Sequence, residues 1–185
     1  PLPAGPLTSD EGAANHMRMQ GRNGEGVHLF VYGKDALNAQ RTPVSYPARH
    51  TLQACEGIIR LHGLNPKQVL CLQQHPDAID AGVFHNDVIA TANAELLLYH
   101  ERAYVKGDMV AEWLHTSFPH AGWKIVKVTE AELPLKEAVS TYLFNSQVVS
   151  LPGGGMAYIA PSECAEHAAV SALIQRWMDD ETNPI

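Results

Sequence analysis

Apolar residues in the first part of the chain follow two different periods. Residues 27–32 form a short run of β-branched and aromatic side chains, which predicts a strand. Residues 51–62 place apolar side chains three to four positions apart behind Thr51, which predicts a helix that starts at this threonine. Residues 68–73 predict a second short strand, whereas residues 1–26, rich in Gly, Pro and Asn, predict a loop.

The middle of the chain contains the same signals in a fuller order. Residues 87–92 and 96–100 predict two strands joined by a tight turn around Asn93. An amphipathic helix is expected over residues 104–118, and a strand over residues 123–128. The pattern is therefore hairpin, helix and strand.

The last part of the chain starts this pattern again. An apolar run over residues 139–150 leads into three consecutive glycines, after which residues 156–160 are expected to pair back as a strand. Residues 163–178 predict a helix. Because the closing strand is missing, we expect an α/β protein built from repeated ββαβ-like units, and a chain that is a fragment of a longer protein.

Charge and cysteine content narrow the classes of partner. The formal net charge is −7, which argues against nucleic acid and anionic membranes, since both need a basic patch. The three cysteines include no CxxC pair, so we expect free thiols in a reducing, cytoplasmic compartment. No apolar run approaches the roughly 18 residues that span a membrane.

The run GVFHNDVI at residues 82–89 carries the strongest candidate chemistry. Gly82 permits a tight turn, and an extended backbone would put His85 and Asp87 on one side with Asn86 opposite. A histidine beside a carboxylate can exchange protons near neutral pH. The alternative, in which the two side chains only cap a turn, stays open.

Two further charged residues lie in loops. Glu11 has small neighbours that would let a ligand approach the backbone, and its carboxylate suits a guanidinium. Arg49 closes a loop just before the first helix, where it could bind a carboxylate through two hydrogen bonds. The alternatives for Glu11 are an exposed acidic loop or a helix N-terminus that Asp10 caps, and the alternative for Arg49 is a surface ion pair.

Three other features of the sequence are weaker indications of a functional site. Cys164 starts a predicted helix, where its thiol pKa would fall, but a small buried cysteine that packs a helix is the alternative. His115 and His120 lack a third ligand nearby, so we expect no metal site there. The glycines at 153–155 are followed by neither Lys nor a helix, which predicts a hairpin turn and not a phosphate loop.

Taken together, these runs resemble the N-succinylarginine dihydrolase family. The matching stretches, in order along most of the chain, are DEGAANH (10–16), LFVYG (29–33), YPAR (46–49), GVFHNDVIA (82–90), STYLFNSQ (140–147) and EC-x-EHA (163–168). The resemblance implies a hydrolase of arginine catabolism from the guanidine-modifying superfamily. It also implies that superfamily's fold, an α/β propeller of five ββαβ units, of which this chain would cover two to three.

The resemblance implies a reaction that needs no cofactor and no metal. A cysteine thiolate attacks the guanidinium carbon of N2-succinylarginine, ammonia leaves, and water hydrolyses the covalent intermediate. A second round gives N2-succinylornithine, carbon dioxide and another ammonia. By match of motif, Glu11 and His85 are catalytic residues. Asp87 would hold the guanidinium nitrogens and Arg49 a carboxylate of the substrate.

One departure from the family matters. The family's nucleophile lies in a Gly-Pro-Ala-Cys run near its C-terminus, and Cys164 matches a different position. We therefore expect residues 1–185 to be a partial propeller domain, without the N-terminal units and the nucleophile segment, and inactive by itself. The alternative function is a non-catalytic module that binds an arginine-like ligand. The expected partner is a small molecule, and open sheet edges would also favour a homo-oligomer.

Overall fold

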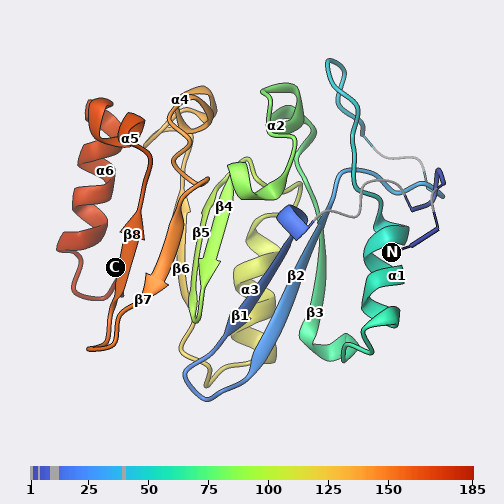
Figure 1. Ribbon diagram of the computed structural model, residues 1–185, viewed down its shortest axis with the longest axis horizontal. Coiled ribbons are helices and arrows are strands. Elements are labelled where there is room, and N and C mark those ends of the chain that lie inside the picture. The colour runs from blue at the N-terminus through green and yellow to red at the C-terminus, as the bar shows by residue number, and fades with distance from the viewer. Residues whose placement is uncertain (1, 4, 9–12, 39–40) are drawn as a thin grey trace.

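The computed structural model describes residues 2–3, 5–8, 13–38 and 41–185, which form three small sheets interleaved with helices (Figure 1). The α/β fold class expected from the sequence is confirmed. The first sheet contains β1 (His16–Gln20), β2 (Gly26–Tyr32) and β3 (Val69–Gln73), and α1 (Leu52–Leu61) connects β2 to β3.

The second sheet repeats this order of elements. It contains β4 (Ala90–Asn93), β5 (Leu96–His100) and β6 (Lys124–Val128), with α3 (Asp108–Ser117) connecting the last two strands. In both sheets the first two strands are antiparallel and the last two are parallel. A helical crossover is the connection that a parallel pair requires.

The third sheet is a hairpin of β7 (Gln147–Ser150) and β8 (Met156–Ile159), followed by α5 (Ser162–Glu166) and α6 (Ala168–Asp179). Short helical segments connect the sheets. They are η1 (Ala13–Asn15), η2 (Pro66–Gln68), α2 (Pro76–Asp80), η3 (Asn86–Val88) and α4 (Leu135–Ser140).

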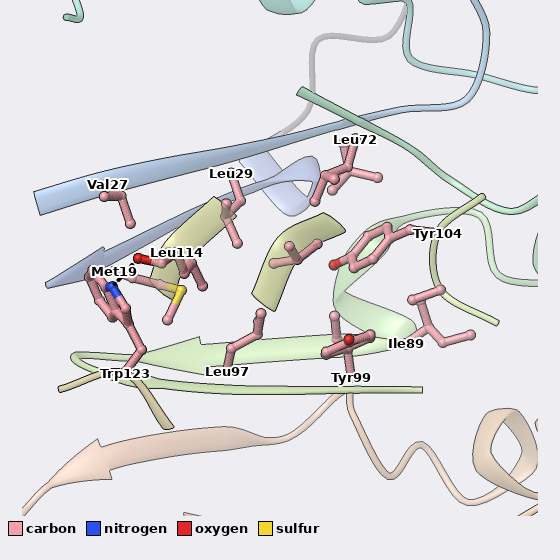
Figure 2. Close-up of a cluster of buried hydrophobic side chains, with 14 of the residues drawn as sticks. Met19, Val27, Leu29, Leu72, Ile89, Leu97, Tyr99, Tyr104, Leu114 and Trp123 are labelled. Carbon is pink, nitrogen blue, oxygen red and sulfur yellow. Dashed lines mark hydrogen bonds between the residues drawn. The ribbon is translucent and has the colours of Figure 1, made fainter. Parts of the chain in front are cut away.

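Two apolar cores lie on opposite faces of the second sheet. Leu97 and Tyr99 face α3 and the first sheet, in the cluster that Figure 2 shows together with Met19, Leu29 and Leu114. The flanking residues of β5 face the other way, toward β7, β8 and α6. Because β5 is covered on both faces, its sequence is a continuous apolar run and not an alternating one.

The first strands of the three sheets lie side by side. β1 contacts β4, and β4 contacts β7 (Figure 1). At the end of this array where β1 stops, the backbone N–H of Gln20 donates to the carbonyl of Ala94 at 2.9 Å. The Nδ2 of Asn93 donates to Ser150 Oγ at 2.8 Å. The opposite end of these strands, where each of them begins, carries the candidate site.

Several predicted elements are confirmed. The strand over residues 27–32, the helix from Thr51 and the hairpin turn at residues 153–155 form as expected. Thr51 caps α1 by accepting a hydrogen bond at Oγ1 from the N–H of Ala54 at 3.1 Å.

Other predictions were wrong. Residues 16–20 form β1 and not a loop, because Met17 and Met19 face the core between outward polar residues. The strand expected from residue 87 begins at Ala90, after the turn of η3. The helix expected from residue 104 begins at Asp108, because Tyr104 lies in the core before it.

Helices α2 and α4 were not predicted, and the last helix is interrupted. Its two parts, α5 and α6, are separated at His167, whose ψ of 108° is extended. The ring Nδ1 of His167 then caps α6 by accepting from the N–H of Val170 at 3.4 Å. Cys164 therefore lies in a helix of five residues and not at the start of a long one.

Candidate active site

The sequence motifs meet where β1, β4 and β7 begin. DEGAANH leads through η1 into β1, GVFHNDVIA leads through η3 into β4, and the Asn145 segment leads into β7. The antiparallel partners β2 and β5 end beside these starts. The site is thus at the carboxyl end of the parallel strands, which is where ligands bind in open α/β sheets.

Asp87 lines a cavity of about 240 Å³ between the beginnings of β1 and β4. The lining also includes Ala13, Ala14 and His16, and the two alanine side chains are too small to fill the space. Burial raises the pKa of the Asp87 carboxyl above its ordinary value, and the neighbouring His85 opposes that shift. A cation bound beside Asp87 would favour the ionised form in the same way.

His85 precedes η3 with an extended backbone (φ −135°, ψ 156°) and is half-buried. The expectation that His85 and Asp87 lie on one side of a strand is wrong, because residues 86–88 form a 3-10 turn. The turn is closed by the N–H of Val88, which donates to the His85 carbonyl at 3.3 Å. The two side chains nevertheless interact, since His85 lowers the pKa of Asp87.

Asn86, between the two candidate residues, is buried in a chain of side-chain hydrogen bonds. Its backbone N–H donates to Asn15 Oδ1 at 3.0 Å, and its own Oδ1 accepts from the hydroxyl of Tyr104 at 2.8 Å. These bonds connect η1, η3 and the segment that follows β5. Sequence reasoning missed Asn15 and Tyr104, although Asn15 lies inside the DEGAANH motif.

Two further side chains hold the same turn. Gln74, buried at the end of β3, donates through Nε2 to the carbonyl of Val83 at 2.9 Å. The Nδ2 of Asn145 donates to the carbonyl of Asp87 at 3.4 Å. Gly82 has a φ of +98°, which confirms the tight turn expected there and which side chains disfavour. Together with the bonds from Asn15 and Tyr104, these contacts hold residues 82–87 from four segments of the chain.

Arg49 is exposed and follows the buried Ala48. Its loop runs beside the end of β2, where the N–H of Gly33 donates to the His50 carbonyl at 2.7 Å. An edge-to-face contact between Tyr46 and Phe84, with ring centroids 5.1 Å apart, brings YPAR against the loop of His85. Arg49 is not among the described residues that line the 240 Å³ cavity. The structure therefore places it on a loop that contacts the loop of His85, outside the cavity wall.

The YPAR loop is fixed by one carboxylate. Asp80, at the end of α2, accepts hydrogen bonds from the backbone N–H groups of Val44, Ser45 and Tyr46 at 2.6–3.2 Å. These bonds lower the pKa of the Asp80 carboxyl. Residues 44–46 are thereby tied to the segment that leads to His85.

Glu11 lies outside the described residues. Ala13 and Ala14, which follow it closely in the sequence, line the cavity beside Asp87. The assignment of Glu11 as a catalytic residue stays a prediction, as do those of His85, Arg49 and Asp87.

The cysteines of the chain are unsuited to act as thiolates. Cys164 is 1% exposed, its Sγ donates to the Thr141 carbonyl at 3.3 Å, and burial raises its pKa. Burial also raises the pKa of Cys55, and that of Cys71 to about 11. All three are free thiols, as expected. The alternative interpretation of Cys164, a buried cysteine that packs a helix, therefore fits the structure.

Within the described ranges, no group of three or more His, Cys, Asp and Glu side chains is arranged to hold a metal ion. Among the same residues, no helix is long and apolar enough to cross a membrane.

Comparison with known proteins gives the family. Residues 1–185 match the family described as succinylarginine dihydrolase. Curated N-succinylarginine dihydrolases from Chromohalobacter salexigens and Nitrosospira multiformis are 49% and 44% identical, each over 100% of this chain and 41% of the relative. The one from Aeromonas hydrophila is 45% identical over 95% of this chain and 40% of the relative. The chain thus spans about two-fifths of the length of these relatives.

A solved structure gives a weaker likeness. The N-terminal domain of ArgZ, an arginine dihydrolase from the ornithine-ammonia cycle in cyanobacteria, aligns with a TM-score of 0.44 and 15% identity. The alignment covers 78% of this chain and 43% of that one. A likeness at this level carries no argument about the fold or the site.

Proposed function

Because this chain belongs to the succinylarginine dihydrolase family, we propose that it is the section of an N-succinylarginine dihydrolase that supplies proton transfer and guanidinium binding. The full-length protein converts N2-succinylarginine and two water molecules into N2-succinylornithine, carbon dioxide and two molecules of ammonia. This is a cytoplasmic step of arginine catabolism. It breaks carbon–nitrogen bonds at the guanidinium carbon.

The observation that carries the proposal is the position of Asp87. Its half-buried carboxylate lines a cavity that is also lined by Ala13 and Ala14, which directly follow the DEG run in the sequence. A guanidinium offers a planar set of N–H donors that match a carboxylate. Burial strengthens such a pair, since the surroundings screen charge less than water does. Asp87 therefore holds the guanidinium group of the substrate.

The other residues have complementary roles. His85 transfers protons to the departing ammonia and from the attacking water, because an imidazole can both donate and accept a proton. Glu11 is the second proton-transfer group on the amidine nitrogens. Arg49, on a loop that contacts the loop of His85 through Tyr46 and Phe84, binds a carboxylate of the succinylated substrate.

The attacking thiolate comes from outside residues 1–185. In support of this, burial raises the pKa of all three thiols in the chain, which disfavours a thiolate near neutral pH. The thiolate forms a bond to the guanidinium carbon, and ammonia leaves with a proton from His85. Water then attacks the same carbon and gives a proton to His85, and the carbon–sulfur bond breaks to return the thiolate and leave a ureido group. A second round on the ureido group releases the second ammonia and carbon dioxide.

The fold of the full-length protein is an α/β propeller. The proposal is supported by the shared topology of the first two sheets and by the side-by-side arrangement of β1, β4 and β7. Each sheet buries apolar side chains against a neighbour, as the units of a repeated array do. In such an array the first strands surround one central site.

The test is an ammonia assay on the full-length protein with N2-succinylarginine. We expect two ammonia molecules for each N2-succinylornithine formed, and much slower release from arginine. Absence of ammonia release would contradict the assignment. The 185-residue chain is expected to release none, and turnover by it would contradict an external nucleophile. Binding of N2-succinylarginine by full-length protein that does not turn it over would instead favour a binding module.

A further inference from the structure

We propose that Tyr104 and Asn15, acting through Asn86, are positioning residues that set the orientation of His85 and Asp87. The proposal rests on the function proposed above, because it assigns these residues to the same reaction. Neither Tyr104 nor Asn15 lies among the charged groups that the motifs assign to chemistry. Both are almost fully buried, with 2% of each residue exposed.

Asn86 connects the hydrogen bonds of Asn15 and Tyr104 to the two site residues. It is 1% exposed and lies between the two site residues, so its backbone is shared with both. The N–H that donates to Asn15 belongs to the peptide that joins His85 to Asn86. Holding this peptide fixes ψ of His85 and φ of Asn86, and with them the direction in which the imidazole leaves the backbone.

Tyr104 anchors that turn to the protein core. Its ring belongs to the apolar cluster between the first two sheets and lies 5.7 Å from the ring of Tyr99. Burial raises the pKa of the Tyr104 phenol, so its hydroxyl keeps the proton that it donates to Asn86 Oδ1 at 2.8 Å. The side chain has few ways to move, because the ring is packed and the segment bridges to Gln74.

Asn15 connects the same turn to η1, which lies in the DEGAANH motif. Asn15 comes four positions after Glu11 in that motif. A change in the bond between Asn15 and Asn86 therefore alters the spacing between η1 and the loop of His85. The network keeps two motifs in register that come from different sheets.

Some buried amide donors of this network are not satisfied by a hydrogen-bond acceptor. The Nδ2 atoms of Asn15 and Asn86 are buried and have no hydrogen-bond partner among the described residues. Such donors destabilise a fold relative to an apolar core. Natural proteins depart from such packing rules mainly at functional sites. The position of these amides next to His85 and Asp87 fits that expectation.

The test compares Tyr104→Phe with Tyr99→Phe in the full-length protein. Both substitutions remove one hydroxyl from neighbouring buried rings, and the Tyr99 hydroxyl donates to the Gly107 carbonyl at 3.3 Å, away from Asn86. We expect kcat of Tyr104→Phe to fall about ten- to hundredfold, because small displacements of reacting groups have effects of this size. Tyr99→Phe should stay within about twofold of wild type, with a similar change in melting temperature.

Each result decides the proposal. A fall in kcat for Tyr104→Phe alone, at matched melting temperatures, supports it. Equal kcat values for the two variants overturn it. If wild-type protein releases no ammonia, the proposed function fails, and hydrogen exchange then decides whether the network holds the turn. Faster exchange over residues 83–88 in Tyr104→Phe than in Tyr99→Phe supports the network, and equal exchange overturns it.

Discussion

The side-chain oxygen of Asn15 accepts a hydrogen bond from the backbone N–H of Asn86, 71 residues away in the sequence, at 3.0 Å. This bond joins the beginnings of two sheets at the candidate active site. Asn15→Ala leaves a buried N–H without an acceptor, so we expect the free energy of unfolding to fall by about 1–3 kcal/mol. Urea unfolding measures the change.

The matched control for this substitution is Asn23→Ala. Asn23 also accepts at Oδ1 from a backbone N–H, that of Glu25 at 3.2 Å, but in an exposed turn. Its loss should change the free energy of unfolding by no more than about 0.5 kcal/mol. Equal effects of the two substitutions would show that burial of the bond adds nothing.

Asp87→Asn is expected to stabilise the protein at neutral pH while it removes activity. Burial raises the folded-state pKa of Asp87, so ionisation opposes folding as pH rises through that pKa. The neutral amide escapes this cost. Its advantage in melting temperature should be present at pH 7 and vanish below about pH 3.8, where the acid is protonated in both states.

The kinetic effect of Asp87→Asn has the opposite sign. Loss of a charged partner of the guanidinium is expected to lower kcat/KM at least about thirtyfold, which corresponds to about 2 kcal/mol. Steady-state ammonia release from N2-succinylarginine measures it. Unchanged kcat/KM would remove Asp87 from the site.

His16 is expected to make stability depend on pH on the acid side. Burial and, to a smaller extent, the charge of His28, whose Nδ1 lies 2.9 Å from His16 Nε2, together lower the pKa of His16 to about 4. The unfolded chain therefore binds a proton that the folded chain does not bind. Stability should be complete above about pH 6.5 and fall as pH decreases toward 4.

Melting temperatures between pH 4 and pH 8 test this dependence. His16→Gln should show a shallower fall on the acid side than wild type. His120→Gln, at an exposed position, should keep the wild-type slope. The same slope in all three proteins would contradict the expected role of His16.

Gly21→Ala is expected to destabilise the contact between the first two sheets. A Cβ at this position would lie 2.5 Å from the Cβ and 2.8 Å from the carbonyl oxygen of Ala121. Relief of that overlap needs backbone movement, which costs about 1–3 kcal/mol. Gly153→Ala, where no atom lies within 4 Å, should be neutral within about 0.5 kcal/mol. Urea unfolding of both variants checks the difference.

Asp80→Asn is expected to loosen the loop that carries Arg49. Its carboxylate accepts three backbone hydrogen bonds from residues 44–46, and an amide cannot accept all of them equally well. We expect faster hydrogen exchange over that loop and a KM for N2-succinylarginine several times higher, with kcat retained. Asp179→Asn, at an exposed position, is the control. A change in kcat alone would contradict this role.

The sequence predicted the elements that depend on local pattern. The strand over residues 27–32 and the helix behind Thr51 have strong periodicity and clear end signals, and both formed as expected. β1 was missed because its outward residues His16, Arg18 and Gln20 hide a strand with only two core methionines. β1 is stabilised by its pairing with β2, and the pattern within residues 16–20 contains no information about that partner strand.

The charged residues of the candidate site could be predicted from the sequence, but the hydrogen bonds that hold them in place could not. His85 and Asp87 are recognisable because a histidine and an acid lie two positions apart after a glycine. The prediction that both side chains lie on one side of a strand was wrong, because residues 86–88 form a 3-10 turn that depends on long-range hydrogen bonds from Asn15 and Tyr104. Such bonds join residues that lie far apart in the chain, so no window of sequence contains them.

The ends of β1, β4 and β7 that lie opposite the candidate site offer positions for labelling. The β7–β8 turn lies at the end of the array opposite Asn145, and the added Cβ at Gly153 meets no atom within 4 Å (Figure 1). A peptide tag or a fluorophore attached there would sit on the tip of a hairpin, at the opposite end of β7 from the candidate site. The β7–β8 hairpin thus begins at the candidate site and provides, at its tip, a labelling position for following the protein during turnover.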